Sequence, residues 1–383
     1  MKFLIVLTYY RPHISGLTIY AELLAKALVK RGHQVTVLTS RHEKNLPLQE
    51  MVEGVRIVRA PVLLKISKGV IMPTFGLLAT QLIKEHDIVN IHLPQFDSAV
   101  ISAVAKLQKK PSIITYHCDL IMPPGFIPWL ANQSVLMMNH IAGLLTDRLI
   151  TYTQDYADHS PFLSKFKKKV HIISPPVDLP EVTSEEVSEF KNKTNPKNNH
   201  PVIGMAVRFA TEKGVEVVID ALPQVLEKFP HAQLQFAGPY KNIRGEEQYA
   251  ERLMPRIRAF EKSGNWRFLG PLSHKEMALF YQNIDVVVLP SLNATEAFGL
   301  VQIESMISGA PSIASALPGV RQPVLRHGMG KVVPIGDSNA LAAELIDIFS
   351  DPQAYQKDRY LIEKTYLPDT IAQAYENLYA DLI

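Results

Sequence analysis

The chain has 383 residues, of which 47% are hydrophobic and 20% are charged, and its formal net charge is +3. This composition is ordinary for a soluble globular protein, and the length exceeds the size at which single cores usually divide, so we expect two domains. The only cysteine, Cys118, excludes an internal disulfide framework and favours a reducing compartment, which we take to be the cytoplasm.

The first 180 residues predict alternating strands and helices. The apolar runs typical of buried parallel strands lie at 3–8, 34–39, 55–60, 88–93, 111–117, 149–153 and 170–173. Between the first two runs, apolar residues from Tyr20 to Leu28 share one helical face, which predicts a right-handed βαβ unit. Gly16, at the start of that helix, would let a ligand approach the backbone, and the alternative is that it merely makes the turn.

His117 ends the strand predicted at 111–117. In an open parallel sheet, the loops beyond the carboxyl ends of the strands form the binding crevice, so this position favours a functional histidine. A purely structural role is the alternative, since a lone histidine is more often structural than catalytic.

A polar, charged segment at 181–200 predicts an interdomain linker, after which the strand pattern begins again. The strands of this second domain are predicted at 202–207, 233–237, 266–269, 284–289 and 312–315. A helix at 215–226 follows the first of them, and a last amphipathic helix is predicted at 370–382.

The segment after the run at 284–289 carries the clearest binding chemistry. A helix is predicted from near Gly299 to Gly309, with Glu296 in the loop before it and Glu304 inside it. The backbone N–H groups at its start would be free to bind an anion or a ring of hydroxyls; these belong to Phe298, Gly299 and Leu300. Two carboxylates beside these N–H groups indicate a nucleotide-sugar as the ligand. The alternative is a surface loop with two solvated glutamates.

This segment resembles the E-x7-E signature of retaining glycosyltransferases of family 4, also described as glycosyl transferases group 1. The resemblance rests on Leu289-Pro290-Ser291, Glu296-Ala297-Phe298-Gly299-Leu300, Glu304 and Gly309-Ala310-Pro311. Two further segments are similar to family motifs, Thr115-Tyr116-His117 and Arg208 to Gly214 with its Glu-Lys-Gly end. The chain departs from the family at Pro175-Pro176, where relatives carry Asn-Gly, and at Gln322, where they carry an acid.

The resemblance implies the GT-B fold, in which two Rossmann-like α/β domains face each other across a cleft. Residues 1–180 would form the acceptor-side domain, residues 200–365 would bind the donor, and residues 366–383 would return to the first domain. The implied catalytic residues are His117, Arg208, Lys213 and Glu296. The implied donor-binding residues are Gly16, Arg208, Lys213, Gly238, Leu272, Glu296, Phe298, Gly299, Leu300 and Glu304. Among them, Arg208 and Lys213 would hold the diphosphate, and Glu304 would take the ribose hydroxyls.

The implied activity is transfer of a hexose from a UDP- or GDP-linked donor with retention of the anomeric configuration. No Asp-x-Asp pair occurs and the 13 histidines show no metal-ligand spacing, so we expect a metal-independent enzyme without a cofactor. The alternatives are a nucleotide-sugar epimerase on the same fold, a binding protein that has lost catalysis, and a transferase with a small soluble acceptor.

The charge is unevenly divided, and this suggests where the acceptor lies. Residues 1–175 hold 20 basic and 11 acidic side chains, a net charge of +9, which leaves −6 for the rest. Lysines cluster at 106–110 and at 165–169, and an apolar, aromatic loop is predicted at 123–130. We therefore expect peripheral docking on an anionic membrane, the inner face of the cytoplasmic membrane, and a lipid-linked or glycolipid acceptor, with no nucleic-acid partner. The alternative is a solvated basic face with a buried Trp129.

Overall fold

The computed structural model describes residues 1–66, 69–121, 125–243 and 245–382. The chain forms two compact units. Unit 1 contains residues 1–177 together with 366–383, and unit 2 contains residues 178–365.

Unit 1 is built on an eight-stranded sheet with the order β10-β9-β8-β7-β1-β2-β4-β3. Its strands are β1 (Lys2–Val6), β2 (Gln34–Arg41), β3 (Gln49–Val52), β4 (Val55–Pro61), β7 (Ile88–Leu93), β8 (Ser112–Tyr116), β9 (Arg148–Thr151) and β10 (Val170–Ile172). A separate hairpin pairs β5 (Leu64–Ile66) with β6 (Gly69–Ile71). In the large sheet only β3 pairs antiparallel, and strand order reverses between β1 and β7, which is the topological switch point of a doubly wound fold.

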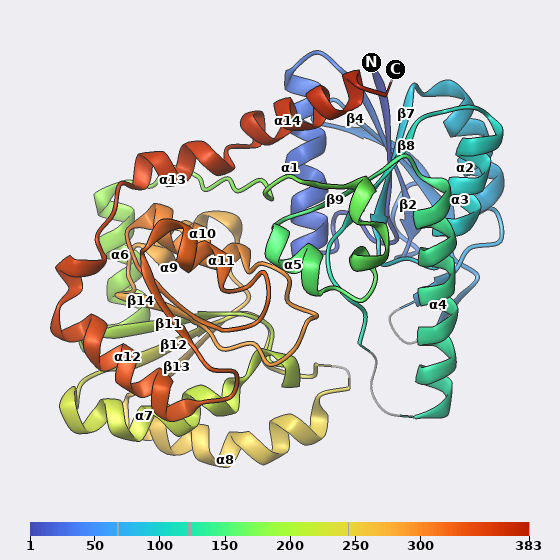
Figure 1. Ribbon diagram of the computed structural model, residues 1–383. Coiled ribbons are helices and arrows are strands. Elements are labelled where there is room, and N and C mark those ends of the chain that lie inside the picture. Colours follow the sequence, from blue (N-terminus) through green and yellow to red (C-terminus); the bar gives the residue numbers. More distant parts are fainter. Residues whose placement is uncertain (67–68, 122–124, 244, 383) are drawn as a thin grey trace. The chain divides into compact units, whose positions relative to one another are not determined.

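Helices cover both faces of this sheet. They are α1 (Gly16–Lys30), α2 (Phe75–Glu85), α3 (Ser98–Leu107), α4 (Phe126–Leu145), α5 (Gln154–His159), a 3₁₀ turn (Leu163–Lys169) and α14 (Pro368–Ala380). The C-terminal α14 packs along α1, where the buried hydroxyls of Tyr20 and Tyr375 are 2.6 Å apart (Figure 1). Arg31, which directly follows α1, adds hydrogen bonds of 2.7 and 2.9 Å to the Glu376 carboxylate, so the last helix is fixed to unit 1 by both packing and charge.

Unit 2 is built on a six-stranded, wholly parallel sheet with the order β13-β12-β11-β14-β15-β16. The strands are β11 (Val202–Ala206), β12 (Gln233–Ala237), β13 (Trp266–Gly270), β14 (Val286–Leu289), β15 (Ser312–Ser315) and β16 (Gly330–Val333). The side chains of the four inner strands, β12, β11, β14 and β15, are buried on both faces, as expected for short apolar runs in a covered parallel sheet. The order reverses between β11 and β14, and this is where such folds bind ligands.

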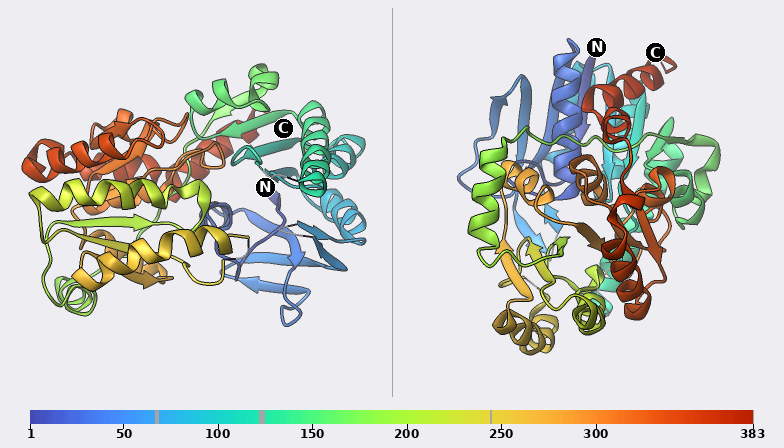
Figure 2. Two further views of the ribbon diagram at one scale, coloured as in Figure 1. Left: turned by 90° about the horizontal axis from the view of Figure 1, so that it is seen from below. Right: turned by 90° about the vertical axis from the view of Figure 1, so that its left-hand side faces the viewer.

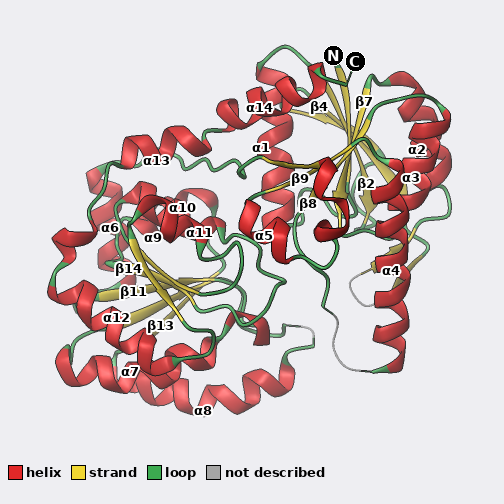
Figure 3. Cartoon of the chain, in the orientation of Figure 1, coloured by secondary structure: helices red, strands yellow, loops and turns green. Residues whose placement is uncertain are grey.

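The helices of unit 2 also lie on both faces of its sheet (Figure 3). They are α6 (Ser184–Thr194), α7 (Val215–Lys228), α8 (Glu247–Ser263), α9 (His274–Tyr281), α10 (Leu300–Ser308), α11 (Gln322–His327), α12 (Ser338–Ser350) and α13 (Arg359–Tyr366), with 3₁₀ turns at Thr211–Lys213 and Pro352–Tyr355. Helices α7 and α8 run side by side (Figure 2), and α7 also packs on α12. Between them and the sheet lies an apolar core that includes Val218, Leu222 and Phe236, each worth about 1.5–3 kcal/mol of burial.

Two sequence predictions about connecting segments were wrong. The polar segment at 181–200 is part of unit 2, because α6 begins with a capping box at Thr183 and buries Phe190 as it packs against α9. The stretch 126–130, predicted as part of a loop, is the first turn and a half of α4, while residues 123–124 lie outside the described residues. Among the helices that the structure describes, none is long and apolar enough to cross a membrane.

Candidate functional site

The loops after β11 and β14 contact each other closely at the switch point of unit 2. Gly214 has a φ of +67°, and a Cβ placed on it would lie 2.1 Å from the carbonyl oxygen of Pro290. The backbone N–H of Leu292 donates to the carbonyl of Glu212 at 2.9 Å. These contacts bring the ends of two loops together although about 80 residues separate them in sequence.

Lys213 and Glu296 meet where the two loops touch. The Lys213 ammonium donates to Glu296 Oε2 at 2.6 Å, and the two side chains are only 16% and 19% exposed. Arg208, at the end of β11, is paired in the same way with Glu212. Both cations predicted to hold a diphosphate are thus present at one sheet edge, each with a carboxylate partner that the sequence analysis did not assign to it.

The amino end of α10 lies beside this ion pair in the chain. Gly299 adopts a φ of +82°, and a Cβ there would approach Leu289 Cδ2 to 2.2 Å, so this position requires glycine. No side chain among the described residues caps the helix at Gly299. The helix dipole therefore places a partial positive charge at this end of α10, and the binding of an anion or of hydroxyl oxygens by residues 298–300 stays a prediction.

Gln302 holds the loop before α10 in place, and the sequence analysis missed it. Its side chain is fully buried, and Nε2 donates to the carbonyls of Phe298 at 2.8 Å and Val320 at 2.9 Å. Its Oε1 accepts from Ser312 Oγ at 3.2 Å. An amide on the buried face of a short apolar helix is the signal that could have indicated this role, because buried amides need several partners.

Glu304 lies on α10, whereas Glu296 lies in the loop before that helix. The Glu304 carboxylate accepts a hydrogen bond of 2.6 Å from the Tyr281 hydroxyl. Burial raises the pKa of the Glu304 carboxyl, and the bond from Tyr281 acts in the opposite direction. A partly desolvated carboxylate with unused lone pairs is a strong acceptor for a pair of ligand hydroxyls.

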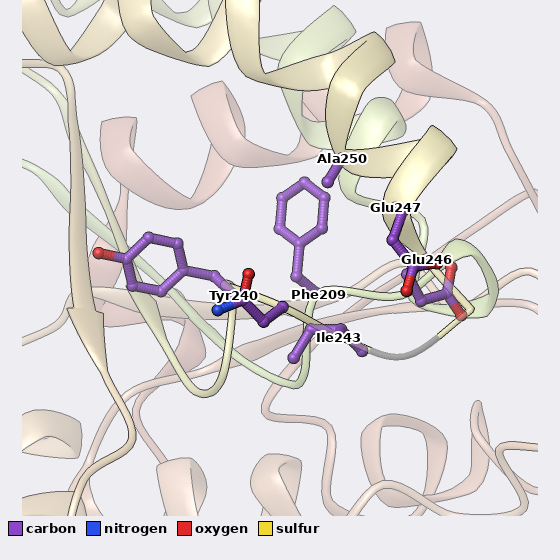
Figure 4. A pocket seen from close by; sticks show the side chains of 7 residues that line it. Phe209, Tyr240, Ile243, Glu246, Glu247 and Ala250 are labelled. Atoms are coloured by element: carbon purple, nitrogen blue, oxygen red, sulfur yellow. The ribbon is translucent and has the colours of Figure 1, made fainter.

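The other predicted donor residues follow β12 and β13. Gly238 has a φ of +136°, and its Cβ would lie 2.1 Å from the carbonyl of Val207, so the chain there needs glycine for close backbone packing. Leu272 is half-buried after β13. A cavity of about 200 Å³ opens nearby and is lined by residues of the loops after β11 and β12 and the start of α8 (Figure 4), namely Phe209, Tyr240, Asn242, Ile243, Glu246, Glu247 and Ala250. It is too small for a whole nucleotide-sugar.

Gly16 and His117 belong to unit 1. Gly16 begins α1 after a capping box in which Ser15 Oγ accepts from the Thr18 N–H, and a Cβ on Gly16 would meet no atom within 4 Å. His117 follows β8 and is 5% exposed, with its Nε2 2.8 Å from His92 Nδ1 and its Nδ1 bonded to the Tyr152 hydroxyl. Both ring nitrogens of His117 are therefore engaged within unit 1.

No group of three or more His, Cys, Asp or Glu side chains in the described parts of the chain is arranged to hold a metal ion. The cations at the switch point are instead Arg208 and Lys213.

Comparison with known proteins identifies the family. A model described as Glycosyltransferase Family 4 matches residues 14–181, and one described as Glycosyl transferases group 1 matches residues 186–367. The chain belongs to the family 4 glycosyltransferases. Its two doubly wound units have the GT-B fold: HepE of Anabaena, solved in complex with UDP, superposes with a TM-score of 0.76 over 100% of both chains at 18% identity.

Two curated relatives illustrate the range within this glycosyltransferase family. The phosphatidyl-myo-inositol mannosyltransferase of Mycolicibacterium smegmatis is 26% identical over 354 residues, covering 88% of this chain and 82% of the relative. A D-inositol 3-phosphate glycosyltransferase of Catenulispora acidiphila is 25% identical over 361 residues, covering 89% of this chain and 83% of the relative.

Proposed function

We propose that the protein transfers a hexose from a nucleotide-sugar to an acceptor hydroxyl, with retention of the anomeric configuration and without a metal ion. The observation that carries this proposal is the 2.6 Å contact between Lys213 and Glu296 at the switch point of unit 2. An ammonium has three donors and a carboxylate about four acceptor positions. Lys213 and Glu296 can therefore keep their mutual hydrogen bond while each also binds a ligand. Lys213 suits a phosphate oxygen and Glu296 suits sugar hydroxyls.

The residues of unit 2 supply what the leaving group needs. When the bond between the sugar C1 and the diphosphate oxygen breaks, its electron pair leaves with that oxygen, and Arg208 and Lys213 stabilise the developing negative charge. The acceptor oxygen forms the new bond to C1 on the same face, and its proton passes to the departing diphosphate oxygen. The amino end of α10 adds a fixed positive potential at this edge of the sheet.

The nucleoside end of the donor would lie toward Glu304. Its carboxylate suits the two ribose hydroxyls, and the segment 269–272 at the end of β13 is the expected place of the base. HepE is solved with UDP and with UDP-glucose, which supports testing UDP-linked sugars first and GDP-linked sugars second.

Incubation with labelled UDP- and GDP-hexoses tests the proposal. Without an acceptor, a transferase hydrolyses the donor slowly; with an acceptor, it forms a glycoside. The coupling constant of the anomeric proton of the product, measured by NMR, reports retention or inversion. An epimerase changes the sugar with no acceptor present, and a binding protein leaves it intact. Either of these two results, or an inverted product, contradicts the proposal.

For the acceptor, we propose a lipid-linked sugar or glycolipid at an anionic membrane, with the protein docked peripherally on the inner face of the cytoplasmic membrane. The supporting observation is α4, a helix of 20 residues without any Asp, Glu, Lys or Arg. Its exposed apolar side chains recur at helical spacing along one side, and they are Phe126, Trp129, Leu130, Met137 and Leu144. The exposed side of a helix in a soluble protein is normally polar. An uncharged helix face about 30 Å long therefore suits a lipid interface.

The charge of unit 1 supports the same proposal. Unit 1 holds 20 basic and 14 acidic residues and unit 2 holds 20 and 23, so the net charges are +6 and −3 once α14 is counted with unit 1. The exposed lysines available to lipid headgroups are Lys106, Lys109, Lys165, Lys167 and Lys168. Lys169 has a different role, because its ammonium donates to the carbonyls of Gly143, Leu144 and Thr146 at the end of α4.

The alternative to a lipid acceptor is a small soluble acceptor in the cytoplasm. The relative named for D-inositol 3-phosphate favours this alternative and the phosphatidyl-myo-inositol mannosyltransferase favours the lipid. The exposed face of α4 supports the lipid, since a soluble acceptor gives no reason for Trp129 to be 56% exposed.

A further inference from the structure

Three polar side chains meet at the carboxyl ends of neighbouring strands in unit 1. His92 lies near the end of β7, His117 directly follows β8, and Tyr152 directly follows β9. They are 1%, 5% and 9% exposed, respectively. His92 Nδ1 is 2.8 Å from His117 Nε2, and His117 Nδ1 is bonded to the Tyr152 hydroxyl, so the imidazole of His117 is held from both sides.

The direction of these hydrogen bonds follows from the far side of His92. Its Nε2 is buried and has no hydrogen-bond partner among the residues that the structure describes. A buried N–H without an acceptor is rarer and costlier than a buried lone pair without a donor, so Nε2 carries the lone pair and Nδ1 carries the proton. His92 then donates to His117 Nε2, and His117 donates from Nδ1 to the Tyr152 oxygen.

Both rings are neutral in this arrangement. Burial lowers the pKa of His92 to about 3. Burial also lowers the pKa of His117 well below its ordinary value, and the neighbouring His92 acts in the same direction. A neutral ring with both nitrogens bonded cannot take a proton without losing one of its partners. We therefore expect the His117 ring to act as a group held in a fixed orientation and not as a proton acceptor.

We propose that His92 is a positioning residue, which holds His117 in its Nδ1–H tautomer and in one ring orientation at the acceptor-side sheet edge. The inference rests on the proposed function, together with the catalytic role that the resemblance to family 4 implies for His117. Without the donor from His92, the His117 ring can turn over and exchange tautomers, and the segment after β8 loses its fixed geometry. Because misplacement by about 1 Å can cost about 100-fold in rate, the effect should fall on the transfer step.

Two substitutions of nearly equal size separate positioning from packing. The amide nitrogen of Asn is attached at Cγ, as Nδ1 is, so His92→Asn can still donate to His117. In His92→Gln the amide nitrogen lies one bond further out, near the place of Nε2. Each variant is first compared with the wild type by thermal unfolding.

The first readout is the tautomer of His117, measured by long-range ¹⁵N–¹H NMR on histidine-labelled protein and assigned with His117→Gln. We expect a protonated Nδ1 in the wild type and in His92→Asn, and a mixture of tautomers in His92→Gln. The second readout is steady-state transfer, in which kcat falls about 10- to 100-fold in His92→Gln while the donor KM stays within about twofold, and His92→Asn restores most of kcat.

Two results overturn the inference. One is an unchanged His117 tautomer in His92→Gln, and the other is an equal loss of kcat in both variants, which would mean a packing role only. If His92→Gln does not fold, Tyr152→Phe removes the acceptor at the other side of His117 and must shift the same tautomer equilibrium. The NMR readout needs no substrate, so a wild-type protein that transfers no sugar refutes the proposed function without deciding the role of His92.

Discussion

The carbonyl oxygen of Pro290 occupies the space that a side chain at position 214 would need, since a Cβ on Gly214 would lie 2.1 Å from it. This close contact joins the loop that carries Lys213 to the loop that carries Glu296. The ion pair of the proposed donor site therefore depends on a glycine that takes no part in it.

Gly214→Ala should disrupt the donor site through this contact. The positive φ alone costs about 1–2 kcal/mol for a residue with a Cβ, and the clash with Pro290 forces the two loops apart. We expect a loss of stability in urea unfolding that exceeds this amount, together with weaker nucleotide binding. Gly336→Ala is the matched control, because its φ is +76° but a Cβ there would meet only Leu292 Cδ2 at 4.0 Å. Equal effects of the two substitutions would contradict the prediction.

Lys213→Ala should lower kcat/KM for transfer by about 2–4 kcal/mol, or roughly 30- to 1,000-fold, the loss typical of a preorganised charge-stabilising donor. It also leaves the part-buried Glu296 carboxylate without its cation. Arg208→Ala should act in the same direction. Lys228→Ala, at the exposed end of α7, removes the same charge away from the site and should have no effect. Near-normal turnover of folded Lys213→Ala would refute the phosphate assignment.

Activity should survive dialysis against excess chelator, because in the proposed mechanism Arg208 and Lys213 neutralise the diphosphate in place of a metal ion. Added Mg²⁺ or Mn²⁺ should raise kcat by no more than about twofold. Loss of transfer in EDTA that only a divalent ion restores would show that the phosphate chemistry is different.

Glu304 should couple recognition of the ribose to pH. Burial raises the pKa of its carboxyl, and ribose hydroxyls bind the ionised form, so binding releases a proton and the affinity should fall as the pH is lowered toward that raised pKa. Hydrogen bonds to a charged acceptor are worth about 1.5–3 kcal/mol, so a ribonucleoside diphosphate should bind roughly 10- to 150-fold more tightly than its 2′,3′-dideoxy analogue at neutral pH.

Titration calorimetry of both ligands with Glu304→Gln provides the control. The amide cannot ionise, so the preference for the ribose should shrink and lose its dependence on pH. An equal preference in the wild type and in Glu304→Gln at every pH would show that the ribose is recognised elsewhere.

The sequence predicted the strands that precede the proposed donor site, but it did not predict the ion pairs within that site. Arg208, Lys213 and Glu296 could be placed at strand ends from the apolar runs before them. Their partners could not, because Glu212 could pair with either cation, and only the strand order of the sheet brings Lys213 against Glu296. His92 gave no signal for the same reason: its partner lies 25 residues away on the next strand.

Local signals also misled in two places. The stretch 123–130 was predicted as a loop, but α4 already begins at Phe126. Pro128 is compatible with this start, because a proline in the first turn of a helix has no hydrogen bond to lose. The charged sequence of α6 suggested a linker, although Thr183 and Glu186 form a capping box that marks the start of a helix.

The membrane proposal predicts that the protein sediments with anionic vesicles, such as phosphatidylcholine with 30% phosphatidylglycerol, and not with phosphatidylcholine alone. Each lysine near an anionic surface contributes about 1 kcal/mol, screened within a Debye length, so binding should weaken as salt rises. Lys165, Lys167 and Lys168 changed together to Ala should reduce binding about 100-fold. Lys169 is left intact, because its loss would uncap α4.

Trp129→Glu tests the apolar face of α4 separately from the charges, since it places a carboxylate where the exposed indole would enter the interface. It should abolish vesicle binding while leaving nucleotide binding in unit 2 unchanged. The control removes three exposed lysines from the start of unit 2, Lys191, Lys193 and Lys197, and so changes the total charge equally. If this control weakens vesicle binding as much as the unit 1 variant, only net charge matters and docking through α4 is wrong. Efficient transfer to a small soluble acceptor, with no response to lipid charge, would exclude the membrane acceptor.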